Sequence, residues 1–249
     1  MRPLPFSFAA AGRPAGVFAD AEAGPYAEAA ARPHPAWTAA GLALGVAAAS
    51  DPRAVPAGPA EEAAASAMSP RRRREFLAGR LAARRALGAV GLDCGEIPRS
   101  GRLPLFPPGR AASIAHSAGV AVALAGAPGH DLPLGCDLEL RPLPAGAARL
   151  VLRQDEEALL RNPRPGTVPW SVTSLFSAKE AAWKALHTGP RALPGGALRS
   201  LRDLRARPAA PAAEGLLIGT RTGPALAVHV HVEAVGAGVL STVLGWAPR

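Results

Sequence analysis

The stretch PLGCDLEL, residues 133–140, combines the pattern of a β-strand with two acidic side chains. Apolar and polar residues alternate along it, and successive side chains of a strand point to opposite faces of a sheet. Asp137 and Glu139 therefore share one face, and Cys136 with the leucines occupies the other. A carboxylate beside apolar neighbours is costly unless a cation or a hydrogen-bond donor meets it. We expect such a partner opposite these carboxylates; a solvent-facing strand is the alternative.

A second stretch, SLFSAKEAAWKAL at 174–186, holds both lysines of the chain. The pattern predicts a helix from Ser171 to His187, and Glu180 and Lys184 share one of its faces in the favourable order for an ion pair. Every other basic residue is arginine. An ammonium is a compact charge that can release a proton, whereas a guanidinium stays protonated. We therefore expect Lys184 to have a chemical role; a surface ion pair with Glu180 is the alternative.

Basic charge is concentrated in a third stretch, which follows a proline- and alanine-rich segment at 51–66 that we interpret as a connector. Ser69 and Pro70 are typical of a helix start, and the predicted helix extends to Val90. Its residues 71–85 contain seven arginines against one acid. The helix dipole disfavours cations in the first turn, so we expect an anionic partner there. A solvated helix face is the alternative.

The remaining pattern predicts further helices and strands. Alternating apolar residues around a Ser-Ala-Gly turn indicate a hairpin at 113–126, and another helix is expected at 149–160. Three strand candidates, near 215–221, 225–235 and 238–246, form a meander at the end of the chain. No sequence repeat of a usual period accompanies them.

Length and composition exclude several classes of protein. The 249 residues are enough for one large domain or two of ordinary size. The formal net charge of +9 is largely compositional, because the chain is rich in arginine and alanine. Cys94 and Cys136 are too few for a disulfide framework and lack the spacing of a zinc site. Because no signal peptide or membrane-spanning pattern is present, we expect a soluble cytoplasmic protein without a membrane partner.

Asp137, Glu139 and Glu180 form a set of carboxylates without a matching histidine or cysteine. Such a set suits a hard cation such as Mg²⁺, which typically binds carboxylates together with substrate phosphates. The arginine-rich helix and Lys184 would bind the phosphates. The chain lacks a P-loop, a dinucleotide-binding glycine motif and the nucleophile elbow of hydrolases. These residues indicate a metal-assisted reaction on a phosphate compound.

Five segments identify a family when they are taken in order. They are EFLAGRLAARRAL at 75–87, GRLPLFPPG at 101–109, SIAHS at 113–117, GCDLEL at 135–140 and FSAKEAAWKAL at 176–186. This set resembles the 4'-phosphopantetheinyl transferases of the Sfp type, and the branch that contains enterobactin synthase component D is the closer likeness. The family signature is G-x-D-x-E followed by [FW]-S-x-K-E-x-x-x-K.

The resemblance implies an α+β fold of two similar α/β lobes in a pseudo-twofold arrangement. We expect an N-terminal lobe at 1–131 that contacts the nucleotide of coenzyme A and includes an extension at 1–65. The C-terminal lobe at 132–249 would hold the magnesium carboxylates and the catalytic helix. Coenzyme A and Mg²⁺ would lie in the cleft between the lobes of a monomer.

The implied reaction is that of a holo-[acyl-carrier-protein] synthase. The 4'-phosphopantetheine arm of coenzyme A moves to a serine of an apo acyl, peptidyl or aryl carrier protein, and 3',5'-ADP is released. Nonribosomal-peptide, polyketide and siderophore pathways use such carriers. The resemblance implies a carrier protein as partner and no nucleic acid.

The resemblance also assigns roles at the reacting centre. Asp137, Glu139 and Glu180 match the magnesium ligands of the family. Glu180, or a water on the metal, is the candidate base for the carrier serine, and Lys184 matches the lysine that contacts the pyrophosphate.

Further positions match the nucleotide contacts of the family. His116 matches a histidine that binds phosphate, although the family usually has serine where this chain has Ala115. Arg102 stands where the family often has a lysine at the 3'-phosphate. Three arginines of the basic helix would lie beside the adenosine and the 3'-phosphate: Arg80, Arg84 and Arg85.

Two alternatives belong to other classes of protein. The helix at 71–85 also fits an arginine-rich nucleic-acid-binding protein, although few aromatic residues accompany it. The departure at Ala115 also fits a protein that binds coenzyme A without transferring its arm.

Overall fold

The computed structural model describes residues 34–129, 131–161, 170–188, 193, 198–209 and 215–247. Residues 1–33 of the predicted N-terminal extension lie outside these ranges. Within the described ranges, no helix combines the length and the hydrophobicity that a transmembrane segment requires.

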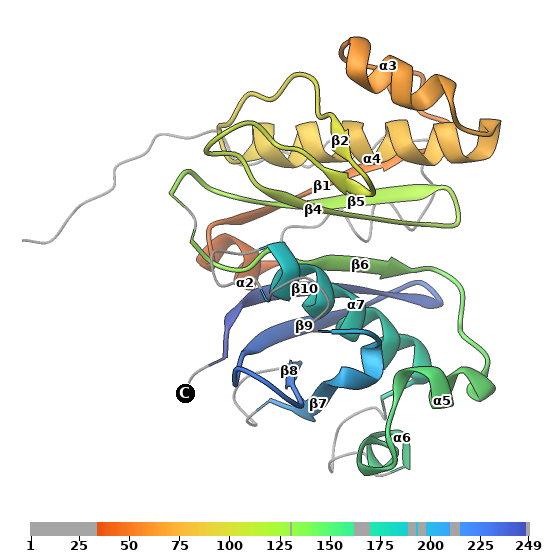
Figure 1. The fold of residues 1–249 in the computed structure, drawn as a ribbon, viewed down its shortest axis with the longest axis vertical. Helices are drawn as coiled ribbons and strands as arrows, with labels where there is room; N and C mark the ends of the chain where they lie inside the picture. The colour runs from red at the N-terminus through yellow and green to blue at the C-terminus, as the bar shows by residue number, and fades with distance from the viewer. Residues whose placement is uncertain are drawn as a thin grey trace, which may run out of the picture.

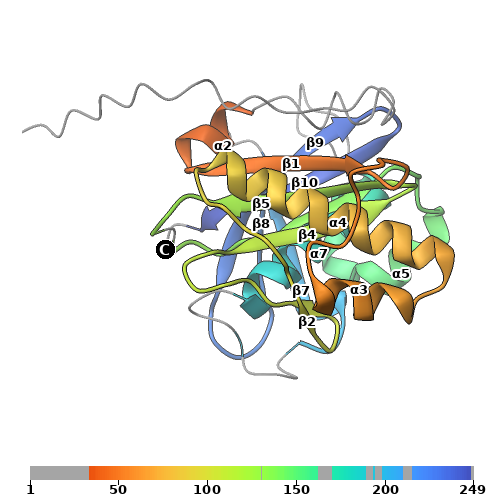
Figure 2. The ribbon, with the colours of Figure 1, turned by 90° about the horizontal axis from the view of Figure 1, so that it is seen from above.

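The first structural unit is a long helix, α4 (Pro70–Ala89), packed on a three-stranded antiparallel sheet (Figures 1 and 2). The strands, in spatial order, are β1 (Leu42–Ala48), β5 (Val120–Gly126) and β4 (Ala112–Ser117). Alanines fill much of the layer between helix and sheet, among them Ala78, Ala82 and Ala86 of the helix and Ala121, Ala123 and Ala125 of β5. Small side chains let the helix lie close to the strands. The predicted basic helix and the predicted hairpin are both confirmed.

The second unit repeats this arrangement with a larger sheet and the helix α7 (Val172–Thr188). Its antiparallel strands, in spatial order, are β6 (Cys136–Glu139), β10 (Gly238–Trp246), β9 (Ala227–Val235), β8 (Leu216–Thr220) and β7 (Leu204–Pro208). Leucines and valines of the sheet pack against apolar residues of α7. The mixed helix and sheet content agrees with the predicted α+β class. The pseudo-twofold relation between the units stays a prediction.

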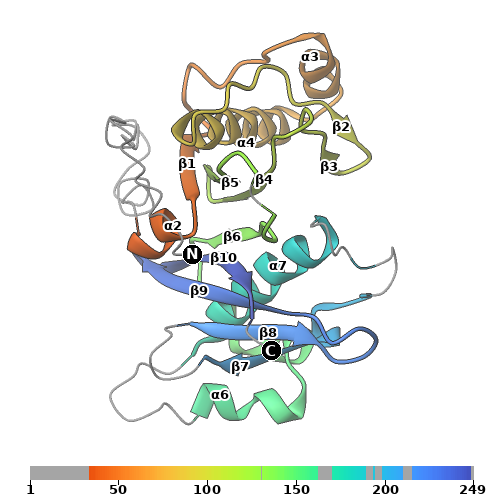
Figure 3. The same cartoon turned by 90° about the vertical axis from the view of Figure 1, so that its left-hand side faces the viewer.

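The two sheets meet where β4 lies against β6 (Figure 3). The hydroxyl of Ser113 accepts a hydrogen bond from the Cys136 amide at 3.0 Å, and the hydroxyl of Ser117 accepts one from the Leu140 amide at 3.1 Å. An apolar core shared by both units continues this junction. The predicted lobe boundary at Asp131 falls in the connection between β5 and β6, next to the junction.

Short elements complete the described chain. They are α2 (Pro35–Ala39), α3 (Pro59–Ser66), β2 (Arg99–Ser100), β3 (Leu103–Pro104), α5 (Ala148–Val151), α6 (Ala158–Arg161) and 3₁₀ turns at Ala145–Ala147, Gln154–Glu156 and Leu201–Asp203.

The prediction of a connector at 51–66 was wrong for its second half. Pro59 begins helix α3, and the carboxylate of Glu96 accepts hydrogen bonds from the first amides of this helix, those of Ala60 and Glu61. The Glu61 side chain is fully buried and pairs with Arg84 at 2.9 Å. A side chain distant in sequence therefore caps a segment that its own composition marks as irregular.

The predicted helix at 149–160 is interrupted. The backbone is extended at Leu152, between α5 and a 3₁₀ turn. The Glu156 carboxylate turns into the core and accepts hydrogen bonds from the amides of Arg153 at 3.1 Å and Ala206 at 2.8 Å. The break at Leu152 leaves the Arg153 amide available to this buried acid.

Gly135 allows α7 to lie directly against the start of β6. A methyl group at this glycine would overlap the carbonyl oxygen of Ala181 and would lie 3.0 Å from the Cβ of Ala185. Gly45 of β1 has the same role beside α4, where a methyl group would overlap backbone atoms of Ala82 and Ala86. Each long helix is therefore held close to its sheet at a glycine.

We predict that Gly135→Ala lowers the free energy of unfolding by about 2 kcal/mol or more, because the added methyl group must push a helix away from a strand. Urea titration followed by circular dichroism measures the loss. Gly146→Ala is the matched control, because no atom lies within 4 Å of its added methyl group. Equal stability of the two variants would contradict a close contact at Gly135.

Candidate functional site

Asp137 and Lys184 form the centre of the site, where β6 faces α7. The Lys184 ammonium donates to Asp137 Oδ1 and to the Cys136 carbonyl, both at 2.9 Å. The hydroxyl of Ser177 donates to the Asp137 carbonyl at 3.3 Å. The strand face that carries Asp137 therefore points to the helix that carries the lysine. Lys184 contacts Asp137 of the strand. The sequence alone also allowed a surface ion pair between Lys184 and Glu180.

Two further carboxylates lie close enough to Asp137 to affect its surroundings. Burial first, and then the charge of Asp137, raise the pKa of Glu139 to about 7, although the Ser117 hydroxyl and Lys184 act against this shift. Burial and Asp137 also raise the pKa of Glu180, against the effect of Lys184. Burial lowers the pKa of the Lys184 ammonium, but Asp137, followed by Cys136 and Glu180, outweighs burial and the net shift is upward. Negative charge is therefore crowded here, with Lys184 as the nearby cation.

These three carboxylates fit a divalent cation in chemistry. In the part of the chain that the structure describes, Asp137 Oδ2 is buried and no hydrogen-bond donor reaches it. Burial and the charge of Asp137 raise the pKa of Glu139 and of Glu180, so a nearby cation would stabilise the charged form of each acid. Oxygen ligands of this kind are those that Mg²⁺ prefers. Among the described residues, however, no three acidic, histidine or cysteine side chains converge as a finished metal site.

The other lysine, Lys179, is a structural residue. Its side chain is fully buried, and its ammonium lies 2.8 Å from Glu156 Oε1. It also donates to the carbonyls of Val151 at 2.8 Å and Leu204 at 3.1 Å. Arg221 completes the group, 2.6 Å from Glu156 Oε2. The network joins α7 to the interrupted helix and to β7, so the two lysines on α7 serve different purposes.

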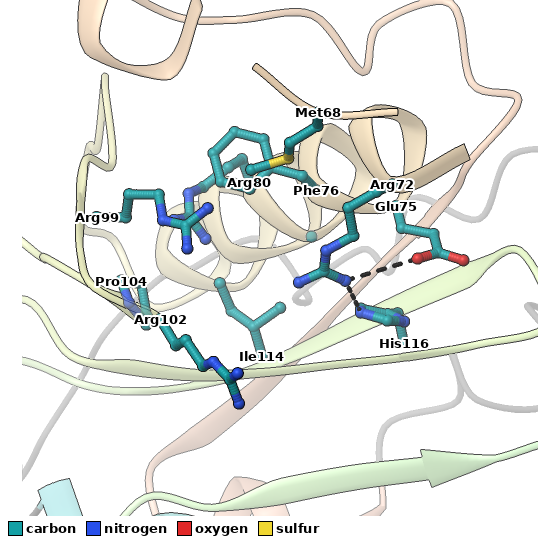
Figure 4. A pocket seen from close by; sticks show the side chains of 11 residues that line it. Met68, Arg72, Glu75, Phe76, Arg80, Arg99, Arg102, Pro104, Ile114 and His116 are labelled. Carbon is teal, nitrogen blue, oxygen red and sulfur yellow. Dashed lines mark hydrogen bonds and ion pairs between the residues drawn. The ribbon is translucent and has the colours of Figure 1, made fainter. Parts of the chain in front are cut away.

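An arginine-lined pocket of about 500 Å³ lies between α4, β4 and the β2–β3 hairpin (Figure 4). Four arginines and one carboxylate line it, together with His116: Arg72, Arg80, Arg99, Arg102 and Glu75. Positive charge therefore exceeds negative charge in the pocket. His116 lines the pocket from β4, the strand that packs against β6, and the charges of Lys184 and Asp137 affect its pKa.

The three arginines predicted to contact a nucleotide occupy different surroundings. Arg80 lines the pocket, where its Nε donates to the Ile97 carbonyl at 2.8 Å and its guanidinium lies 4.4 Å from the Phe76 ring centre. Burial is the main reason that its pKa falls to about 10, and neighbouring arginines add to the effect. Two of the three do not line the pocket: Arg84 pairs with Glu61, and Arg85 pairs with Asp51 at 2.8 Å.

Two further arginines of the pocket, Arg72 and Arg99, were not predicted as individual site residues from the sequence. Arg72 belongs to the run of first-turn arginines, for which an anionic partner was expected. Three other arginines of the helix form ion pairs with acids outside the pocket. They are Arg73 with Glu62, Arg84 with Glu61 and Arg85 with Asp51. Only the fold could separate the arginines that face the pocket from those that form ion pairs.

Comparisons with known proteins agree with this arrangement. A family model described as the 4'-phosphopantetheinyl transferase N-terminal domain matches residues 60–126, which include α4, β4 and β5. A model of the 4'-phosphopantetheinyl transferase superfamily matches residues 133–237, which include β6 and α7. The 4'-phosphopantetheinyl transferase Svp of Streptomyces mobaraensis is 35% identical over 131 residues, 51% of this chain and 53% of that protein. The chain thus matches about half the length of this curated relative.

We predict that Lys179→Met lowers the free energy of unfolding by about 3 kcal/mol or more, because it removes one member of a buried ion pair and the ammonium that donates to the Val151 carbonyl. Thermal and urea unfolding measure the effect. Arg161→Ala is the control, since it removes an exposed pair with Glu157 and is expected to cost about 0.3–0.5 kcal/mol. A Lys179→Met protein as stable as the parent chain would refute this structural role.

Proposed function

We propose that the chain moves the phosphopantetheine arm of coenzyme A to a serine of an apo carrier protein, because its residues 60–126 and 133–237 match 4'-phosphopantetheinyl transferase family models. The reaction would release 3',5'-ADP. The observation that carries this proposal is the arginine-lined pocket beside the Asp137–Lys184 pair, whose charges affect the pKa of His116 in the pocket. An enzyme that cleaves the pyrophosphate of a phosphorylated nucleotide needs an anion pocket next to a reacting centre of this kind.

The pocket would bind the nucleotide end of coenzyme A. Guanidinium groups bind phosphates through paired, charge-assisted hydrogen bonds. Arg102 is exposed and no ion pair engages it among the described residues, so it is free to meet a 3'-phosphate. Arg72, Arg80 and Arg99 add positive charge to the same pocket, which His116 also lines.

The reaction would take place between β6 and α7. The hydroxyl oxygen of the carrier serine attacks the phosphorus that bears the pantetheine arm, and the bond from that phosphorus to the bridging oxygen breaks. Glu180 would accept the serine proton, and burial makes its carboxylate a stronger base than usual. Lys184 would balance the charge that develops on the departing phosphate. Its raised pKa keeps it charged at neutral pH.

Asp137, Glu139 and Glu180 would hold Mg²⁺, which supplies positive charge at the pyrophosphate when bound. The unpartnered Oδ2 of Asp137 supports this assignment. Lys184 balances part of the carboxylate charge through its contact with Asp137.

The finer assignment follows the sequence motifs. We propose an enzyme of the Sfp type, near the branch of enterobactin synthase component D, that acts on carriers of nonribosomal-peptide, polyketide or siderophore pathways. The excess of arginines over acids in the pocket suits an acidic carrier. We further propose a cytoplasmic monomer in which residues 1–131 and 132–249 form the two lobes.

We predict that the protein, incubated with coenzyme A, Mg²⁺ and a panel of apo carriers, adds the mass of the arm to a carrier serine. Asp137→Asn should slow this transfer by at least about a hundredfold, because it weakens the cation site. Asp93→Asn is the matched control, since Asp93 is an exposed acid outside the site. Intact-protein mass spectrometry follows the product.

Two outcomes would contradict the proposal. Tight binding of coenzyme A without modification of any carrier would favour a binding protein without transferase activity. Normal turnover by Asp137→Asn would refute the metal assignment.

We also predict that Arg102→Ala raises the KM for coenzyme A about tenfold, the effect of losing one charge-assisted contact. Arg207→Ala is the control, because it removes the same charge from exposed β7 in the other sheet. Initial rates at varied coenzyme A concentration give both constants. Equal effects of the two substitutions would show that net charge, rather than a local contact, controls binding.

A further inference from the structure

Arg72 makes a direct contact with His116 at the edge of the pocket (Figure 4). Its Nη1 lies 2.6 Å from His116 Nε2, and the same nitrogen lies 3.6 Å from Glu75 Oε2. The guanidinium comes from the first turns of α4 and the imidazole from β4. Two elements distant in sequence therefore bring a permanent cation against a residue that can gain or lose a proton.

The chemistry of this contact fixes the state of the imidazole. A guanidinium has only donors, so Nε2 must be the acceptor and cannot carry a proton while the contact exists. The ring is then neutral, with its proton on Nδ1. A neutral ring of this form offers no N–H at Nε2 to a phosphate.

We propose that Arg72 is a positioning residue, which keeps His116 neutral in the free protein. When an anion enters the pocket and binds the Arg72 guanidinium, the guanidinium no longer contacts His116 Nε2. The first half of this proposal concerns the free protein alone. The second half rests on the proposed function, because it needs a phosphate ligand in the arginine-lined pocket.

The charges around His116 agree with this geometry. Burial first, and then Arg72 of α4 and Lys184 of α7, lower the pKa of His116. Glu75 of α4 and Asp137 of β6 act in the opposite direction, but the net shift is downward. An arriving phosphate brings negative charge and removes the guanidinium from Nε2, and both changes favour the protonated ring.

Binding of an anion should therefore take up a proton. A proton from solvent binds Nε2 as the guanidinium moves to the phosphate, and the new N–H can then donate to the same anion. No electron is exchanged and no covalent bond of the ligand changes. Glu75 retains Arg72 near the pocket, although Arg71 also pairs with Glu75 at 3.1 Å.

The first experiment tests the free protein. Nitrogen-15 NMR of the histidine rings, with His116→Asn to assign the signal, should show the proton on Nδ1 near neutral pH. Arg72→Ala should raise the pKa of His116, and Arg71→Ala should leave it unchanged. Arg71 is the matched control because it pairs with the same glutamate, but its side chain is 84% exposed and it does not line the pocket. A proton on Nε2, or equal titration in all three proteins, would overturn the proposal.

The second experiment measures proton uptake on binding. Calorimetric titration with coenzyme A at about pH 6.5, in buffers of different ionisation enthalpy, should show uptake of up to about one proton. Arg72→Ala should reduce the uptake, because more of its His116 is already protonated, and Arg71→Ala should not. Binding without proton uptake would overturn the release of Nε2 and leave the proposed function intact. Failure of coenzyme A to bind would overturn the proposed function, and the NMR experiment would still decide the role of Arg72.

Discussion

The close approach of α7 to β6 at Gly135 is the constraint on which the reacting centre depends. A methyl group at this glycine would overlap the Ala181 carbonyl, so the helix can lie this close to the strand because Gly135 has no side chain. The distance between Lys184 and Asp137 follows from that contact. Gly45 holds α4 against β1 in the same way, so the pocket arginines of α4 keep a fixed position over the first sheet. Both halves of the candidate site therefore depend on how closely a helix can pack on a strand.

The two lysines have different roles because one side chain is fully buried and the other is partly exposed. Lys179 is surrounded by protein, and its partners are the Glu156 carboxylate and two backbone carbonyls. Every donor of this ammonium is engaged, which makes the residue a link between elements. Lys184 keeps 29% of its side chain exposed and faces the crowded carboxylates. An ammonium that is both charged and accessible can meet a phosphate, whereas a fully enclosed one cannot.

The arginines are divided in a similar way. The basic helix carries seven arginines between residues 71 and 85, but acids of the first unit pair with several of them. Buried Glu61 and Asp51 each engage one such arginine, because an unpaired carboxylate inside the protein would be costly. The positive charge that faces the pocket comes from two arginines of this helix, Arg72 and Arg80, and from Arg99 and Arg102 of the β2–β3 hairpin. Net charge alone would have overstated how much of the helix is available to a ligand.

The sequence by itself determined the long helices, the hairpin and the strand with Asp137 and Glu139, because each has a periodic pattern that local geometry explains. Its motifs also resemble those of the 4'-phosphopantetheinyl transferases, whose family models match residues 60–126 and 133–237. The strand β1 has no such alternation, since it is buried along most of its length and its sequence is a run of small apolar residues. Only the tertiary structure decided that Lys184 contacts Asp137. It also decided that Arg72 and Arg99 line the pocket. Arg84 and Arg85 lie outside the pocket and form ion pairs. Those choices depend on contacts between residues far apart in the chain, and no local pattern encodes which partner a long, flexible side chain will reach.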